Sequence, residues 1–204
     1  IKKIIYASSS SVYSDDGEEK FKESHTLLRP KSLYGKSKLE NEKYASYLAD
    51  KEDISIIGLR FFSVYGPFGR PDMAYYSFAR SLMNNEKIIL NNYGTMARDM
   101  TYIDDIISGV ISSFKLITEE KTKFKNEIFN LGNDSPVMVV DLLKEIEKQL
   151  SLKAAVIHAH TNNESKYTHA DITKAKKILG YKPETSIDIG MKKFLEWCKK
   201  YERK

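Results

Sequence analysis

A tyrosine and a lysine four residues apart are well suited to acid–base chemistry. Tyr34 and Lys38 lie in the segment Tyr-Gly-Lys-Ser-Lys, which opens a charged, helix-forming stretch. Residues i and i+4 of a helix share one face, so the two side chains project side by side. A free tyrosine has a pKa of about 10, and a neighbouring ammonium favours its phenolate form. The pair therefore predicts a proton acceptor that works near neutral pH.

Serines upstream of this pair complete a possible trio. Ser8 to Ser11 follow the short β-type run at residues 1–6. A serine at the end of a strand can hydrogen-bond the substrate hydroxyl whose proton Tyr34 accepts, while a nicotinamide takes the carbinol hydride. The Tyr-x-x-x-Lys spacing alone also fits an ordinary pair on a solvated helix. The interpretation therefore depends on the serine-tipped strand before it and an apolar strand after it.

The elements that must position these residues alternate between strand and helix. Residues 54–62 form a near-continuous apolar run, typical of a strand covered on both faces. Further strands are expected at 1–6, 87–90, 128–131 and 155–157, and helices at 34–50, 73–84, 101–116 and 186–201. Ser135 followed by Pro136 predicts one more helix start. The alternation predicts an α/β fold with a parallel sheet.

Composition excludes several classes of protein. The 204 residues suffice for one sizeable core plus a small lobe, and no apolar run approaches the roughly 20 residues of a membrane span. The net charge of +5 comes from basic residues interleaved with acidic ones, which argues against nucleic acid as a partner. The single cysteine, Cys198, predicts a reducing, cytoplasmic setting and packs within a helix. The four histidines have no metal-ligand spacing, so no metal site is predicted.

Several motifs, in order, resemble those of the extended short-chain dehydrogenase/reductases, specifically the NAD-dependent nucleotide-sugar epimerases and dehydratases. They lie at residues 6–13 (Tyr-Ala-Ser-Ser-Ser-Ser-Val-Tyr), 34–38, 59–67 (Leu-Arg-Phe-Phe-Ser-Val-Tyr-Gly-Pro) and 98–105 (Arg-Asp-Met-Thr-Tyr-Ile-Asp-Asp). Gly-Arg-Pro-Asp-Met-Ala at 69–74 is similar to the UDP-glucuronate 4-epimerase subgroup. The resemblance extends over essentially the whole chain.

The resemblance implies NAD as cofactor, a UDP-sugar as substrate and roles for individual residues. Tyr34 becomes the catalytic base, tuned by Lys38, and Ser9 the catalytic serine, with Ser10 able to share its role. The implied cofactor contacts are Ala7, Ser8, Tyr34, Lys38 and Phe61. The implied substrate contacts are Ser9, Ser10, Ser63, Arg70 for a sugar carboxylate and Arg98 for the UDP phosphates. The alternatives are a loop salt bridge for Arg70 and a surface charge for Arg98.

The resemblance also implies the reaction. Oxidation of C4 to a ketone, rotation of the keto sugar and return of the hydride to its other face would invert C4. Dehydratases of the family have an Asp-Glu pair where this sequence has Ser10 and Ser11, and decarboxylating relatives have glutamate at the Ser11 position. Epimerisation is therefore favoured, and the resemblance suggests a supply of sugars for polysaccharide synthesis. It also implies a homodimer built on the helix at 34–50.

One part of the family pattern is absent from the sequence. No Gly-x-x-Gly-x-x-Gly occurs, and the resemblance places those pyrophosphate-binding glycines before Ile1. The expected fold is therefore the C-terminal portion of a Rossmann-type parallel sheet (residues 1–66 and 127–133) plus a small α/β substrate-binding lobe (67–126 and 134–204). The open alternatives are a catalytically incomplete fragment that binds a nucleotide sugar and a structural or dimerisation remnant.

Two smaller departures concern the substrate. Asn91 replaces the aromatic residue that the family places against the uracil ring. Residues 162–164 (Asn-Asn-Glu) replace a Pro-Gly-Asp type of sequence. Both leave the identity of the nucleotide sugar open.

Overall fold

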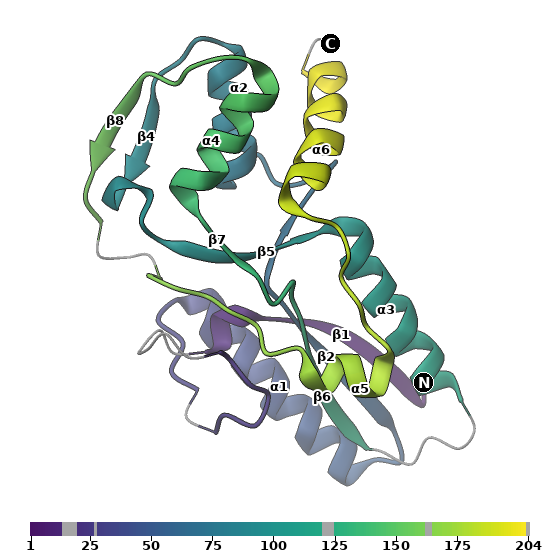
Figure 1. The fold of residues 1–204 in the computed structure, drawn as a ribbon. Helices are drawn as coiled ribbons and strands as arrows, with labels where there is room; N and C mark the ends of the chain where they lie inside the picture. Colours follow the sequence, from purple (N-terminus) through teal and green to yellow (C-terminus); the bar gives the residue numbers. More distant parts are fainter. Residues whose placement is uncertain (14–19, 27, 120–124, 162–164, 203–204) are drawn as a thin grey trace.

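Strands and helices alternate along the chain in the computed structural model (Figure 1). The structure describes residues 1–13, 20–26, 28–119, 125–161 and 165–202. The strands are β1 (Lys3–Ser9), β2 (Ser55–Phe61), β3 (Ser63–Tyr65), β4 (Ile88–Asn91), β5 (Ala97–Tyr102), β6 (Asn126–Leu131), β7 (Pro136–Met138) and β8 (Val156–Ala159). The helices are α1 (Leu33–Lys51), α2 (Ala74–Met83), α3 (Ile103–Thr118), α4 (Val139–Leu150), α5 (Thr173–Leu179) and α6 (Ile187–Tyr201), with short 3₁₀ turns η1 (Ser10–Val12) and η2 (Asn92–Gly94).

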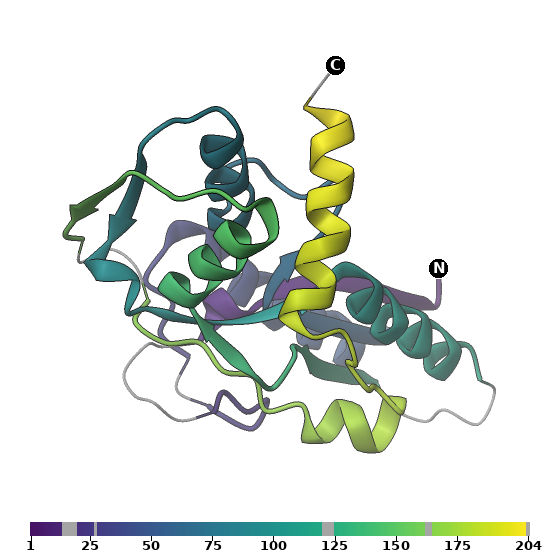
Figure 2. The same ribbon diagram turned by 45° about the horizontal axis from the view of Figure 1, so that its top comes forward.

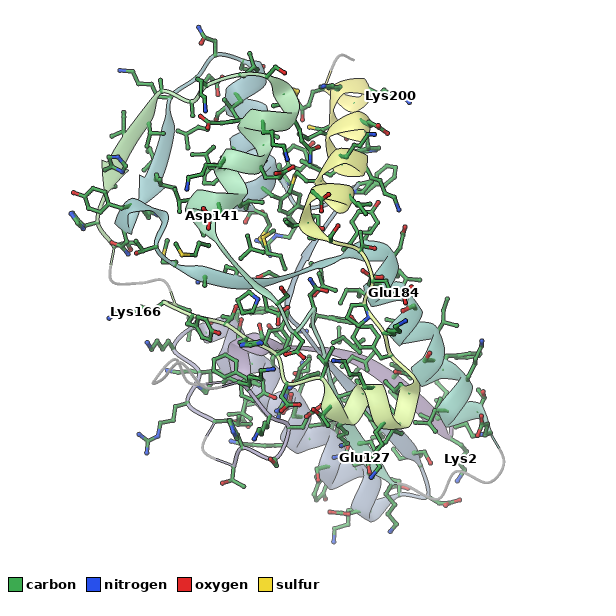
Figure 3. All side chains as sticks on the ribbon, in the orientation of Figure 1. Lys2, Glu127, Asp141, Lys166, Glu184 and Lys200 are labelled. Atoms are coloured by element: carbon green, nitrogen blue, oxygen red, sulfur yellow. The ribbon has the colours of Figure 1, made fainter. Side chains whose placement is uncertain are left out.

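The main sheet has the strand order β1-β2-β6, and all its pairs are parallel. Ser9 is in register with Phe61, and Phe61 with Leu131, so the carboxyl ends of the strands meet at one edge. Figure 3 places Lys2 and Glu127, at the amino ends of their strands, far from Asp141 and Lys200 on the lobe. The predicted parallel α/β sheet of Rossmann type is confirmed, with its carboxyl edge towards the lobe.

Helices cover both faces of this sheet. Alternate residues of β2 point to opposite faces, as expected for a strand. Ile56 packs with Ala45 and Ala49 of α1, whereas Ile57 belongs to a larger core that α3 and α5 join from the other face. The apolar run at 54–62 therefore marks a strand buried on both sides, as predicted.

The second core belongs to the lobe. It consists mainly of side chains from α2, α4 and α6, which lie beside one another in both ribbon views (Figures 1 and 2). Tyr75 and Phe194 are buried at its centre, with ring centroids 4.8 Å apart. Burial raises the pKa of Cys198 to about 11, as suits a thiol packed in a core. The lobe also contains the strand orders β3-β5-β7 and β4-β8.

The predicted helix start at Pro136 is wrong. Residues 136–138 form β7, which pairs antiparallel with β5, and α4 begins three residues later at Val139. Proline is compatible with the first residue of a strand as well as with the first turn of a helix. The partner strand β5 therefore decides between the two, and β5 is absent from the elements predicted from sequence.

One further boundary differs from the predictions. Thr101 and Tyr102 belong to β5 rather than to the following helix, because they pair with Val64 and Tyr65 of β3.

The apolar residues of α6 are not all buried. Ile189 and Tyr201 are 50% and 53% exposed. Met191, Phe194, Leu195 and Cys198 provide the buried face instead.

A buried carboxylate joins the lobe to the sheet. Asp99 is fully buried, and its oxygens accept hydrogen bonds from the backbone amides of Asn133 (2.6 Å), Asp134 (3.1 Å) and Ala170 (2.8 Å). These bonds connect β5 to the end of β6 and to the segment before α5. The division at residues 66, 126 and 133 stays a prediction; α3 and α5, which it assigns to the lobe, contribute to the sheet core.

None of the described helices combines the length and the apolar character that a membrane-spanning helix requires. The cytoplasmic location stays a prediction.

Candidate functional site

A cavity of about 440 Å³ opens where the carboxyl ends of β1 and β2 meet the lobe. Ligands of open α/β sheets bind in such a crevice. Its lining includes eight of the residues singled out from the sequence: Ala7, Ser8, Ser9, Ser10, Tyr34, Phe61, Ser63 and Arg70. Lys38 and Arg98 do not line this cavity.

Ser9 is the last residue of β1 and caps the turn that follows. Its Oγ accepts a hydrogen bond from the backbone amide of Ser11 at 3.1 Å and lies 3.1 Å from the Ser11 hydroxyl. These contacts orient a side chain that is only 8% exposed, at the wall of the cavity. Ser10 lines the same wall and is half-buried.

Tyr34 is in the first turn of α1. The helix begins there because the Ser32 hydroxyl caps it, accepting from the Gly35 amide at 2.9 Å. The Tyr34 side chain is 55% exposed and faces the cavity. Lys38 Nζ lies 5.6 Å from the centre of the Tyr34 ring and donates to the carbonyl of Ala7 at 3.0 Å. The predicted pairing of the two side chains is thus present, with the ammonium anchored to β1.

Gly35 allows α1 to approach the serine turn. A Cβ at this position would lie 2.3 Å from the Ser11 carbonyl oxygen and 2.9 Å from the Pro30 Cβ. Because the Ser11 atom belongs to the backbone, it cannot move aside without shifting the turn that follows Ser9.

Gly35→Ala is therefore expected to destabilise the protein by about 1–3 kcal/mol, the usual cost of forcing atoms into a packed site. In an unconstrained helix the same change would stabilise by about 1 kcal/mol. Urea unfolding measures the difference, with Asn41→Ala on the exposed face of the same helix as the control. A gain in stability for Gly35→Ala would contradict the close approach.

Arg70 is at the rim of the cavity with a partner from its own loop. Its Nε donates to Asp72 Oδ1 at 3.0 Å, and its Nη2 contacts the other carboxylate oxygen. Hydrogen bonding to Asp72 raises the pKa of Arg70, which stays a cation. Both side chains are exposed. The structure thus contains the loop salt bridge that sequence reasoning held as the alternative, at a position where the guanidinium also borders the cavity.

A second cavity of about 460 Å³ adjoins the first and contains Arg98 and Asn91 in its lining. Ser63, Met73 and Tyr75 line both cavities, so the two spaces share a wall. Arg98 donates from Nη1 to its neighbouring carbonyl, Ala97, at 3.0 Å. Residues 162–164, where the sequence departs from the family, lie outside the described residues.

A buried ion pair behind the site is absent from the residues singled out from the sequence. Glu42 of α1 and Arg60 of β2 form two hydrogen bonds, and Glu42 also accepts from the Ser8 hydroxyl. The Ser8 hydroxyl is therefore engaged with α1. A signal was present: a lone arginine in a strand covered on both faces must find a buried partner. Glu42, one turn after Lys38 on the same helix face, was that partner.

The comparisons with known proteins agree with the motifs. The profile of the NAD dependent epimerase/dehydratase family matches residues 1–132. UDP-glucuronate 4-epimerase 4 of Arabidopsis thaliana is 42% identical over 97% of this chain and 48% of its own length. UDP-glucuronic acid 4-epimerase of Bacillus cereus, solved with UDP-glucuronic acid and NAD, superposes with a TM-score of 0.90 at 32% identity, covering 98% of this chain and 62% of that one.

A third similar protein, MoeE5, was solved with UDP-glucose and NAD. It is 27% identical with a TM-score of 0.90, over 99% of this chain and 66% of its own. The chain thus spans between about half and two thirds of the length of these relatives.

The residues at the first cavity suit one end of a dinucleotide. Backbone and hydroxyl groups at Ala7 to Ser10 provide polar contacts beside the apolar ring of Phe61, and the Lys38 ammonium, outside the lining, donates to the Ala7 carbonyl. These groups suit a nicotinamide riboside. The sequence has no glycine-rich turn for the pyrophosphate.

Proposed function

Because this chain belongs to the NAD-dependent epimerase/dehydratase family, we propose that it contributes the catalytic and sugar-binding part of an enzyme that inverts C4 of a UDP-sugar, with UDP-glucuronate as the substrate. The observation that carries the proposal is the single cavity that brings Ser9, Tyr34 and Arg70 together. NAD, when bound, supplies the oxidation of C4 to a ketone and its reduction. The product would serve polysaccharide synthesis.

The chain's own residues handle one proton. Tyr34 accepts it from the C4 hydroxyl and returns it when the ketone is reduced. The Lys38 ammonium lies beside the ring, anchored to the Ala7 carbonyl. Ser9, held by Ser11, hydrogen-bonds the same oxygen and keeps it within reach of Tyr34. No second acid or base is needed, because inversion requires only rotation of the keto sugar.

Other residues would bind the ends of the two ligands. Ala7, Ser8 and Phe61 would contact the nicotinamide side, together with Lys38. Ser10, Ser63 and Arg70 would contact the sugar and its carboxylate. Arg98, in the second cavity, would bind the UDP phosphates, because a planar guanidinium can contact two phosphate oxygens at once.

The test is turnover. The chain is joined to a glycine-rich nucleotide-binding segment taken from a UDP-glucuronate 4-epimerase, and the product is called the joined protein below. Proton NMR then follows its conversion of UDP-glucuronate into the C4 epimer. A folded protein that binds NAD and UDP-glucuronate without interconverting the epimers would overturn the proposal. Calorimetric titration of the 204-residue chain with UDP-glucuronate and with NAD tests the alternative, a fragment that binds the nucleotide sugar but not NAD.

Replacing Arg70 tests the choice of a uronate. For Arg70→Ala in the joined protein, we expect the KM for UDP-glucuronate to rise by about 10-fold or more, since a charge-assisted, bidentate contact is lost. The KM for UDP-glucose, which has no carboxylate, should change by less than about 3-fold. Asp72→Asn is the matched control, because it removes the loop partner and retains the guanidinium. Equal effects on both substrates would contradict the assignment of Arg70 to the carboxylate.

We propose a homodimer built on α1. Tyr44 and Tyr47 are 62% and 56% exposed, with ring centroids 6.4 Å apart, and do not belong to the buried face of this helix. α1 buries Ala45 and Ala49 instead. Sedimentation is expected to show a dimer that the pair Tyr44→Lys and Tyr47→Lys converts to monomer. A monomeric parent protein, or an unchanged dimer in the variant, would refute this.

A further inference from the structure

The first half of α1 contacts the sheet mainly through polar groups. Lys38 donates to the Ala7 carbonyl, and Glu42, one turn later, accepts from the Ser8 hydroxyl. Ala7 and Ser8 directly precede Ser9 in β1. One helix face therefore binds two consecutive residues of the strand that carries the catalytic serine. Leu39 adds an apolar contact from the same half of the helix, and Ala45 and Ala49 pack from its second half.

The Glu42 carboxylate is connected in turn to the rest of the sheet. Arg60 Nε donates to Glu42 Oε1 at 2.8 Å and Arg60 Nη2 to Oε2 at 2.6 Å. The remaining nitrogen, Nη1, donates to the Tyr13 hydroxyl at 2.7 Å, and Tyr13 donates to Asn130 Oδ1 at 2.8 Å. The chain of bonds thus connects α1, β2, the end of η1 and β6.

All the residues of this hydrogen-bond network are buried. Glu42 is 5% exposed and Arg60 2%, and Ser8, Tyr13 and Asn130 are equally enclosed. Burial raises the pKa of Tyr13 to about 12, which maintains its hydroxyl as a donor to Asn130. A buried ion pair is a poor source of stability, because apolar residues of similar volume often serve as well. Its directional bonds, in contrast, define one position of the helix along the strand.

We propose that Glu42 and Arg60 are positioning residues that set the placement of Tyr34 and Lys38 relative to Ser9. The inference rests on the proposed function, since it assigns a role in that reaction. The two hydrogen bonds to Ala7 and Ser8 restrain α1 along β1, in addition to the close approach of Gly35 to the Ser11 carbonyl. The Arg60 guanidinium orients the carboxylate that makes one of these bonds.

The double variant Glu42→Leu with Arg60→Met separates positioning from folding. It removes both charges, so no unpaired charge remains buried, and Tyr13 retains its bond to Asn130. In the joined protein we expect a melting temperature near that of the parent. We expect kcat to fall by about 10- to 100-fold, as for a misplaced catalytic group, with KM changed by less than about 2-fold. Glu42→Gln retains the acceptor for Ser8 and is expected to retain most of kcat.

A folded double variant with the parent's kcat would overturn the inference. If the double variant does not fold, Ser8→Ala replaces it, because this change leaves the Glu42–Arg60 pair intact. A fall in kcat of about 3-fold or more with an unchanged Kd for NAD then supports the inference, and an unchanged kcat, or a fall that accompanies weaker NAD binding, overturns it.

Hydrogen exchange of the amides of residues 7–11 gives a readout without turnover. Faster exchange in the folded variant supports the restraint of β1 by α1, and unchanged exchange overturns it. If the variants show this restraint but the parent protein does not interconvert UDP-glucuronate and its epimer, only the proposed function is refuted.

Discussion

Tyr34→Phe in the joined protein is expected to lower kcat for UDP-glucuronate by about 10²- to 10⁴-fold, the usual contribution of a general acid–base group. The ring faces the cavity, so phenylalanine retains its shape and removes only the hydroxyl that exchanges the proton. KM should change little, because the loss is confined to the transition state. NMR quantification of both epimers in samples quenched at successive times measures the rate.

Two observations make this test selective. Tyr201→Phe, at an exposed tyrosine of α6, is the matched control and should have the rate of the parent. A disturbed core cannot explain a fall in kcat for Tyr34→Phe, because the Tyr34 side chain is about half exposed and is not part of the core. A Tyr34→Phe enzyme with the full rate would remove the proton-transfer role and leave the mechanism without its base.

Glu42→Leu alone is expected to lower the free energy of unfolding of the 204-residue chain by about 3–5 kcal/mol. The change leaves the Arg60 guanidinium buried at the centre of the sheet, where it still donates a hydrogen bond to the Tyr13 hydroxyl but has lost the carboxylate that balances its charge. The Glu42 carboxylate normally raises the pKa of Arg60 against the opposing effect of burial. Urea unfolding followed by circular dichroism measures the loss.

The same experiment has a built-in comparison. Glu40→Leu removes a carboxylate of the same helix that pairs with Lys43 on the surface, and it should have little effect. The double variant with Arg60→Met should recover most of the stability lost by Glu42→Leu. A single Glu42→Leu variant as stable as Glu40→Leu would contradict the buried pair.

Local chemistry and spacing were enough to predict most of the candidate site. The i, i+4 relation places Lys38 beside Tyr34 in any helix, and the alternation of apolar runs with helical segments predicts parallel strands whose carboxyl ends meet. Ser9, Ser10 and Phe61 then fall at the same edge because each lies at the end of a strand. These relations depend only on helix geometry and on the common direction of parallel strands, so they can be predicted from the sequence pattern.

Only the tertiary structure decided how segments distant in sequence meet. Pro136 begins a strand because β5 lies beside it, and Glu42 is buried because Arg60 of β2 faces it. The same holds for Asp99, whose carboxylate accepts hydrogen bonds from backbone amides of two other segments. Hydrogen bonds between distant residues have no period or spacing along the chain. The sequence by itself therefore determined which residues are candidates for the chemistry, and long-range pairing decided what positions them.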